Sequence, residues 1–265
     1  MRALKKVSNT LLLSKGNFEA HLFKGKDDVK TLKEIARARA IAFKTYLPED
    51  VKEDLDEFDL DYYHIYLRDL TNNEIVGAYR LGLGHELFEK NGVEGFYLST
   101  LFELDDQEIF LKQSIELGRS FVLPKYQRKY LCLLMLWKAV YQFFNKYEKI
   151  NYLIGPVSIP CDFCDESNEM IVDYLYDNYN DSKELIPGVQ NFEPKNKWSF
   201  NTLEELEDQL RLKAAYYPVL LKKYLAQNAN VMGFNVDPEF GNSIDVLVCL
   251  HKADTPESTK RCLTK

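Results

Sequence analysis

The spacing of apolar side chains along the chain predicts helices that alternate with strands. Residues 27–47 place apolar side chains at helical spacing, with Asp27 or Asp28 as the cap. Residues 62–70 and 74–84 are two strand-like runs separated by Thr-Asn-Asn, which predicts a β-hairpin with a short turn.

A strand, a long helix and a second strand are predicted in the middle of the chain. The strand covers 113–122, and the helix 126–147 is apolar over most of its surface, which is typical of a helix buried between layers. With the strand 151–159, these elements predict a parallel pair joined by a right-handed crossover. Further helices are expected at 167–179 and 216–229, and two strands around a turn within 230–250.

These elements predict an α/β sandwich with a mixed sheet. We expect residues 1–250 to form a single domain with a lid or insertion around 160–215. Within it, residues 181–200 show no regular pattern and are either a loop over the site or a subdomain boundary. Residues 251–265 form a polar tail that we expect to fray.

Composition narrows the class of protein. The chain has 265 residues with 46% hydrophobic content, enough for a substantial core, and a net charge of -7 that argues against nucleic acid as a partner. No stretch approaches the roughly 20 uninterrupted apolar residues of a membrane span, and the start of the chain lacks the features of a signal peptide. A cytoplasmic location is therefore expected.

The cysteines do not indicate a disulfide framework or a metal site. Their number is five, which is odd for a set of paired cysteines in a chain of this length. Cys161 and Cys164 are close in sequence but lack a second pair or a nearby histidine, so we expect reduced thiols and no metal.

A carboxylate inside an apolar strand is the first candidate for chemistry. Strand alternation places Glu116 with Gly118 and two serines on one face, and Arg119 with apolar residues on the other. The small, polar face resembles the wall of a ligand groove, with Glu116 pointing into it. Alternatively, Glu116 is held in a charge network with Arg119 or Arg80, because burying an unpaired carboxylate costs several kcal/mol or more.

The turn after this strand is basic. Lys125, Arg128 and Lys129 precede a predicted helix whose first backbone N–H groups lack partners within the helix, an arrangement suited to phosphate oxygens. A carrier arm that bears a phosphate would fit there, with its thioester along the Gly118 side of the strand. The alternative is an ordinary solvated helix end.

Several stretches in this order resemble the GNAT acyltransferase superfamily. They include residues 116–140, preceded by 74–84 and 95–106 and followed by 152–159. More narrowly, the chain is similar to bacterial amino-acid N-acyltransferases that make ornithine and glycine lipids, and these also resemble acyl-homoserine lactone synthases. Further matches are 36–47, 54–69, 217–233 and 237–250, so the resemblance spans about 30–250. Both glycines of the usual carrier loop are absent from residues 127–132.

The resemblance implies a GNAT-like fold, with a mixed, mainly antiparallel sheet flanked by helices. It also implies an N-acyltransferase that moves a (3-hydroxy) fatty acyl group to the amino group of a small amino acid, giving a lyso-aminolipid. The donor is a phosphopantetheine thioester, either acyl carrier protein or acyl-coenzyme A, and the positive turn favours the acidic carrier protein as a partner. Peripheral contact with the inner membrane, through residues 219–227, is a further expectation; core packing explains that stretch equally well.

Roles for individual residues follow from this mechanism. Glu116 is the candidate base, because an amine must lose its proton before it attacks a thioester. Backbone N–H groups near Arg119–Val122 are candidates for binding the oxyanion, and Arg119 or Arg80 for holding the acceptor's carboxylate. His64 is a second, weaker base candidate and more readily a structural hydrogen-bonding residue. The expected donor-binding residues are Phe121, Val122, Leu123, Lys125, Gln127, Arg128, Lys129 and Tyr130.

Two other functions are compatible with the sequence. One is an acetyltransferase that uses acetyl-coenzyme A, although the missing glycines count against it. The other is a non-catalytic module that keeps the fold and binds acyl carrier protein or a lipid.

Overall fold

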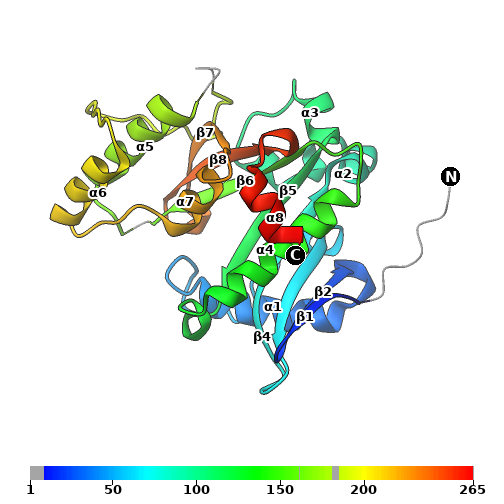
Figure 1. Cartoon of the computed structure of the whole chain (residues 1–265). Coiled ribbons are helices and arrows are strands. Elements are labelled where there is room, and N and C mark those ends of the chain that lie inside the picture. Colours follow the sequence, from blue (N-terminus) through cyan, green and yellow to red (C-terminus); the bar gives the residue numbers. More distant parts are fainter. Residues whose placement is uncertain (1–8, 161, 181–184, 265) are drawn as a thin grey trace.

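An eight-stranded sheet organises the computed structural model, which describes residues 9–160, 162–180 and 185–264 (Figure 1). The order of the strands is β1-β2-β3-β4-β5-β6-β8-β7. Neighbouring strands are antiparallel except β5 and β6, which are parallel. The prediction of a mixed, mainly antiparallel sheet is confirmed. The strands are β1 Thr10–Lys15, β2 Phe18–Lys24, β3 Tyr63–Asp69, β4 Glu74–Leu83, β5 Ser114–Val122, β6 Tyr152–Ile159, β7 Asn230–Asp237 and β8 Ser243–His251.

Helices pack against this sheet. Asp28 caps α1 by accepting a hydrogen bond from the N–H of Thr31, and α1 contacts β4 and β5. In the view of Figure 1, α4 crosses in front of the strands, and it contacts β1 to β5. The helices are α1 Val29–Ala42, α2 Gly84–Asn91, α3 Glu108–Lys112, α4 Tyr130–Asn145, α5 Asp165–Tyr179, α6 Leu203–Leu212, α7 Val219–Leu225 and α8 Glu257–Thr264. Among the described residues, no helix combines the length and apolar character needed to cross a bilayer.

The strands β5 and β6 part soon after they begin. They pair only through Ser114–Glu116 and Tyr152–Ile154, although both strands continue well beyond this point. Gly155 lies where they separate, and a Cβ atom there would be 2.2 Å from the carbonyl oxygen of Leu117. Glycine therefore allows the two backbones to approach closely before they diverge.

A β-bulge interrupts β5 at the point of divergence. Gly118 is opposite Arg80 and Phe121 is opposite Ala78, so two residues of β5 face a single residue of β4. The first of the two, Arg119, has a φ of 48°, a left-handed conformation that non-glycine residues seldom adopt. The bulge changes the direction of the side chains that follow it.

Some predicted elements differ from the structure. Apolar spacing did not predict the β1–β2 hairpin or the helices α2, α3 and α6. Residues 251–265 were expected to fray, whereas residues 257–264 form α8, which packs on α4 and buries Leu263. The lid or insertion expected around 160–215 contains α5 and α6, which pack against each other, and α5 also contacts β7.

Candidate active site

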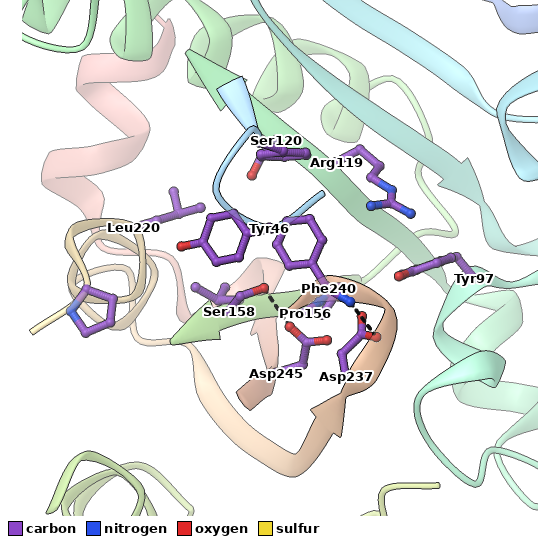
Figure 2. Close-up of a pocket in the computed structure, with 13 residues that line it drawn as sticks. Tyr46, Tyr97, Arg119, Ser120, Pro156, Ser158, Leu220, Asp237, Phe240 and Asp245 are labelled. Atoms are coloured by element: carbon purple, nitrogen blue, oxygen red, sulfur yellow. Dashed lines mark hydrogen bonds between the residues drawn. The ribbon is translucent and has the colours of Figure 1, made fainter. Parts of the chain in front are cut away.

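A cavity of about 180 Å³, here called the central cavity, lies where β5 and β6 diverge (Figure 2). Arg119 and Ser120, the two residues of the bulge, line it from β5, and Ser158 lines it from β6. Asp245 of β8 and Asp237, at the end of β7, complete its polar wall. The divergence of the strands therefore opens a space that several functional side chains share.

Aromatic rings close one side of the central cavity. The rings of Tyr46 and Phe240 stack with their centroids 4.4 Å apart, and Phe43 meets Phe240 edge to face at 5.2 Å. Figure 2 shows Tyr46 and Phe240 side by side between Ser120 and the two aspartates. Because Phe43 and Tyr46 follow α1, this contact joins the N-terminal part of the chain to the β7–β8 turn.

A second cavity of about 300 Å³ adjoins the first and is called here the basic-side cavity. Ser120 lines both cavities. The basic-side cavity brings together four of the expected donor-binding residues, namely Phe121, Val122, Gln127 and Lys129.

The other expected donor-binding residues do not line the basic-side cavity. Leu123 is buried in the core, and Lys125 is paired with Glu74 at 2.7 Å. Arg128 is exposed, and Tyr130 lines a separate groove near α8. The expected donor set is thus only partly assembled.

A third cavity of about 620 Å³, the acidic-side cavity, lies beyond Arg119. Arg119, Tyr97 and Asp237 line both this cavity and the central one. Asp56, Glu57 and Glu239 add carboxylates to its wall. Neighbouring cavities share wall residues, because Ser120 lines the basic-side and central cavities and Arg119 lines the central and acidic-side cavities. Together the three cavities follow β5 from the basic turn to this group of carboxylates.

Glu116 does not line any of these three cavities, so the expectation that it points into a ligand groove is wrong. Its side chain is fully buried; Tyr62 donates a hydrogen bond to Oε2 at 2.8 Å, and the Leu98 N–H donates to Oε1 at 3.2 Å. Burial raises the pKa of Glu116 to about 7. At this position the side chain of Tyr62 and the backbone of Leu98 stand where alternation placed a groove.

Arg119 also lies on a different face from the one that alternation predicts. Its guanidinium is 5.1 Å from the centre of the Tyr97 ring, and that of Arg80 is 5.0 Å from the same ring. Both arginines pair with Asp56, Arg80 at 2.5 Å and Arg119 at 3.4 Å. The bulge therefore turns Arg119 toward Arg80, away from the apolar face that strand alternation assigns to it.

The other two acceptor candidates are buried. Arg80 is 1% exposed and binds Asp56 and Asp59, so the structure does not present it to a substrate. His64 is also 1% exposed, its Nε2 lies 2.8 Å from the carbonyl oxygen of Asp59, and burial lowers its pKa to about 4. His64 is therefore placed as a buried hydrogen-bonding residue, which was the alternative to its role as a base.

Asp245, which lines the central cavity, is not among the site residues predicted from the sequence. The hydroxyl of Ser158 donates a hydrogen bond to Oδ1 of Asp245 at 2.6 Å, drawn as a dashed line in Figure 2. Burial raises the pKa of Asp245 to about 7, although Ser158 partly opposes this shift. The sequence contains a signal for Asp245, because it is a carboxylate within an apolar strand, as Glu116 is.

The structure describes one of the two neighbouring cysteines that were expected to be reduced thiols. Cys161 lies outside the described residues, and Cys164 is exposed. In the part of the chain that the structure describes, no three or more His, Cys, Asp or Glu side chains are grouped to hold a metal ion.

Residues 39–138, from the end of α1 into α4, match the family described as acetyltransferase (GNAT) domain. The chain contains a GNAT acyltransferase domain. The matched region includes the bulge of β5 and the basic turn that follows it.

Curated relatives extend over most of the chain. The chain is 26% identical to a glycine N(alpha)-acyltransferase of Bacteroides thetaiotaomicron, with 87% of this chain and 76% of the relative covered. It is 27% identical to an L-ornithine N(alpha)-acyltransferase of Rhizobium meliloti, with 82% and 76% covered. The domain match and these relatives support the assignment of the chain as an acyltransferase. A looser structural likeness is to the AHL synthase LasI, with a TM-score of 0.47, 12% identity and coverage of 89% and 91%.

Proposed function

We propose that this GNAT protein transfers a fatty acyl group, including 3-hydroxy acyl groups, from a carrier thioester to the amino group of a small amino acid. The product would be an N-acyl amino acid, a lyso-aminolipid. The names of the curated relatives, which act on glycine and ornithine, support this reaction class. The three cavities along β5 provide separate approaches for a donor and an acceptor.

The observation that carries the proposal is the position of the bulge. Ser120 lines the basic-side and central cavities, and the preceding residue, Arg119, lines the central and acidic-side cavities. A thioester that enters from one side and an amine that enters from the other would meet at these two residues. Holding two reactants together in this way replaces a bimolecular encounter and accelerates the reaction.

The donor would approach through the basic-side cavity. Lys129 lies at this cavity with its ammonium 4.7 Å from the centre of the Tyr126 ring, and it is exposed to solvent. A phosphopantetheine phosphate would be attracted to this positive charge. Arg128 is also exposed nearby, and an acidic acyl carrier protein would meet both cations favourably.

The acceptor would approach through the acidic-side cavity. Its carboxylate would pair with Arg119, whose Nε has no hydrogen-bond partner among the described residues. The carboxylates of Asp56, Glu57 and Glu239 would attract the positively charged amino group toward the same cavity. Opposite charges at the two ends of the acceptor would orient it.

The test is to incubate the purified protein with long-chain acyl carrier protein and, separately, glycine, ornithine, lysine or serine. We expect an N-acyl amino acid, detected by mass spectrometry together with the released carrier thiol. Parallel reactions contain acyl-coenzyme A or acetyl-coenzyme A. Consumption of acetyl-coenzyme A alone would replace the proposal with a short-chain acetyltransferase, and no turnover of any donor would favour a binding module.

A further inference from the structure

Two carboxylates line the central cavity, and their hydrogen bonds separate their roles. Oδ1 of Asp237 accepts hydrogen bonds from the N–H groups of Glu239 at 2.9 Å and Phe240 at 3.2 Å, and so caps the β7–β8 turn. Among the described side chains, Ser158 alone is hydrogen-bonded to Asp245, and it donates to Oδ1. In the same part of the chain no donor binds Oδ2, and Asp245 lines the central cavity, so this oxygen is available to a ligand.

We infer that Asp245, held in place by Ser158, removes the proton from the acceptor amine in the central cavity. This inference rests on the proposed function, because it assigns the base of that transfer. It also moves the role expected of Glu116 from β5 to β8. Both Asp245 and the bulge residues line one cavity, so a carboxylate, an amine and a thioester can gather there.

The position of Asp245 in the sheet explains why its orientation is fixed. In the ladder of β8 it is opposite Ser158 on β6 and opposite Asn235 on β7. Strands on both sides therefore constrain its backbone, and the Ser158 hydroxyl constrains its carboxylate. A base that is fixed in this way needs little reorganisation before it accepts a proton.

The charged and titratable groups around Asp245 come from several elements. Asp237 from β7 opposes ionisation of Asp245, whereas Arg119 from β5 favours it. Tyr97 and Tyr46 line the same cavity from the segments after α2 and α1. Because burial dominates, the pKa of Asp245 rises to about 7, a value suited to a base that works near neutral pH.

The acceptor nitrogen loses two protons during the transfer. The ammonium group of the acceptor gives one proton to Asp245, which becomes a neutral acid and later releases this proton to solvent. The nitrogen lone pair then attacks the thioester carbon, forming the C–N bond and a tetrahedral oxyanion. When the oxyanion collapses, the C–S bond breaks, and the carrier thiolate takes a second proton from the nitrogen. The products are an amide and a thiol.

The primary test is Asp245→Asn in the full-length chain, with long-chain acyl carrier protein and whichever amino acid the wild type acylates. We expect kcat/KM at pH 7 to fall by about a hundredfold or more. The wild-type kcat/KM should fall as the pH decreases through about 7. This fall, the acidic limb of the pH–rate profile, should be absent from the variant. The difference between the two proteins should shrink above about pH 9, where the amine loses its proton to water without help.

Glu116→Gln is the matched control, because Glu116 is also a buried carboxylate whose pKa is raised to about 7 by burial. We expect this variant to keep the acidic limb whatever its effect on the rate, because Glu116 hydrogen-bonds to the segment next to Tyr97 but does not itself line the central cavity. If Glu116→Gln abolishes the limb and Asp245→Asn retains it, the assignment is overturned.

Ser158→Ala provides a second measurement that keeps the carboxylate in the protein. Without the Ser158 hydrogen bond, which lowers the pKa of Asp245, the acidic limb should move to higher pH. An unmoved limb in Ser158→Ala would contradict the inference even if Asp245→Asn failed to fold. The two ideas fail separately. The proposed function is contradicted if the wild-type protein forms no N-acyl product. The inference is contradicted if the wild type forms product and Asp245→Asn has the same kcat/KM.

Discussion

The hydroxyl of Tyr62 links Glu116 to the wall of the central cavity. It donates a hydrogen bond to Oε2 of Glu116 at 2.8 Å and accepts one from the backbone N–H of Tyr97 at 2.9 Å. Glu116 also accepts a hydrogen bond from the N–H of Leu98. Glu116 and Tyr62 therefore fix the backbone of a segment whose Tyr97 side chain lines two of the cavities.

Replacing Tyr62 with Phe tests this link. The change removes the hydroxyl and leaves both the Tyr97 N–H and one Glu116 oxygen without a partner in a buried site. We expect the free energy of unfolding to fall by about 1–3 kcal/mol. With Tyr97 less firmly held, KM for the amino acid should rise more than kcat falls. Urea unfolding and steady-state kinetics measure the two effects.

Tyr66→Phe is the control for that change. Tyr66 is also a buried tyrosine, but its hydroxyl donates to Asn9, an exposed residue away from the cavities. We expect a smaller loss of stability and an unchanged KM. Equal effects of the two substitutions on KM would show that Tyr62 has no special connection with the site.

Arg119→Lys tests the proposed recognition of the acceptor carboxylate. Lysine keeps the positive charge but loses the planar fork that pairs with a carboxylate through two hydrogen bonds. We expect KM for the amino acid to rise about tenfold or more. The wild type should strongly prefer an amino acid to the corresponding amine without a carboxylate, and Arg119→Lys should reduce this preference.

Arg68→Lys is the matched substitution on β3, where Arg68 pairs with Glu34 at 2.8 Å outside the three cavities. It should leave both KM and the preference for a carboxylate as in the wild type. A preference that survives in Arg119→Lys would remove Arg119 from acceptor binding.

Lys129→Glu tests the donor side. The change reverses the charge of an exposed residue that lines the basic-side cavity, so an acidic carrier protein should bind more weakly. We expect KM for acyl carrier protein to rise several-fold and to depend less on salt than in the wild type. Lys149→Glu makes the same charge change at an exposed lysine after α4 and should not alter KM. Equal KM values for the two variants would place carrier binding elsewhere.

The sequence predicted the elements around the site better than the site itself. The helix capped by Asp28, the β3–β4 hairpin and the parallel β5–α4–β6 unit all follow from local periodicity, and the structure confirms them. Within residues 219–227, Leu221, Tyr224 and Leu225 are buried in the core, as the core-packing alternative for that stretch expects, and the membrane contact stays a prediction.

The orientation of the site residues depends on two features that periodicity does not contain. Strand alternation misplaced Arg119, because a bulge with a positive φ shifts the alternation by one residue. Asp245 and Ser158 are 87 residues apart in sequence and meet only through the register of β6 and β8. Long-range pairing of this kind becomes visible only in the folded chain.

The pH dependence of stability offers an independent check on Asp245. Burial raises the pKa of its carboxyl from an ordinary value near 3.8 to about 7, so the folded protein holds this proton more tightly than the unfolded chain. The group therefore contributes stability that is present at low pH and is lost between about pH 4 and pH 7. From the size of the shift, the loss is on the order of 4 kcal/mol at most.

Asp245→Asn removes the ionisable group and should remove this part of the pH dependence. We expect urea unfolding to show the variant losing less stability than the wild type between pH 5 and pH 8. Asp208→Asn, at an exposed carboxylate on α6, should follow the wild-type curve. Parallel curves for Asp245→Asn and the wild type would mean that the Asp245 carboxyl ionises at its ordinary pH, and a base with an unshifted pKa would no longer explain an acidic limb near pH 7.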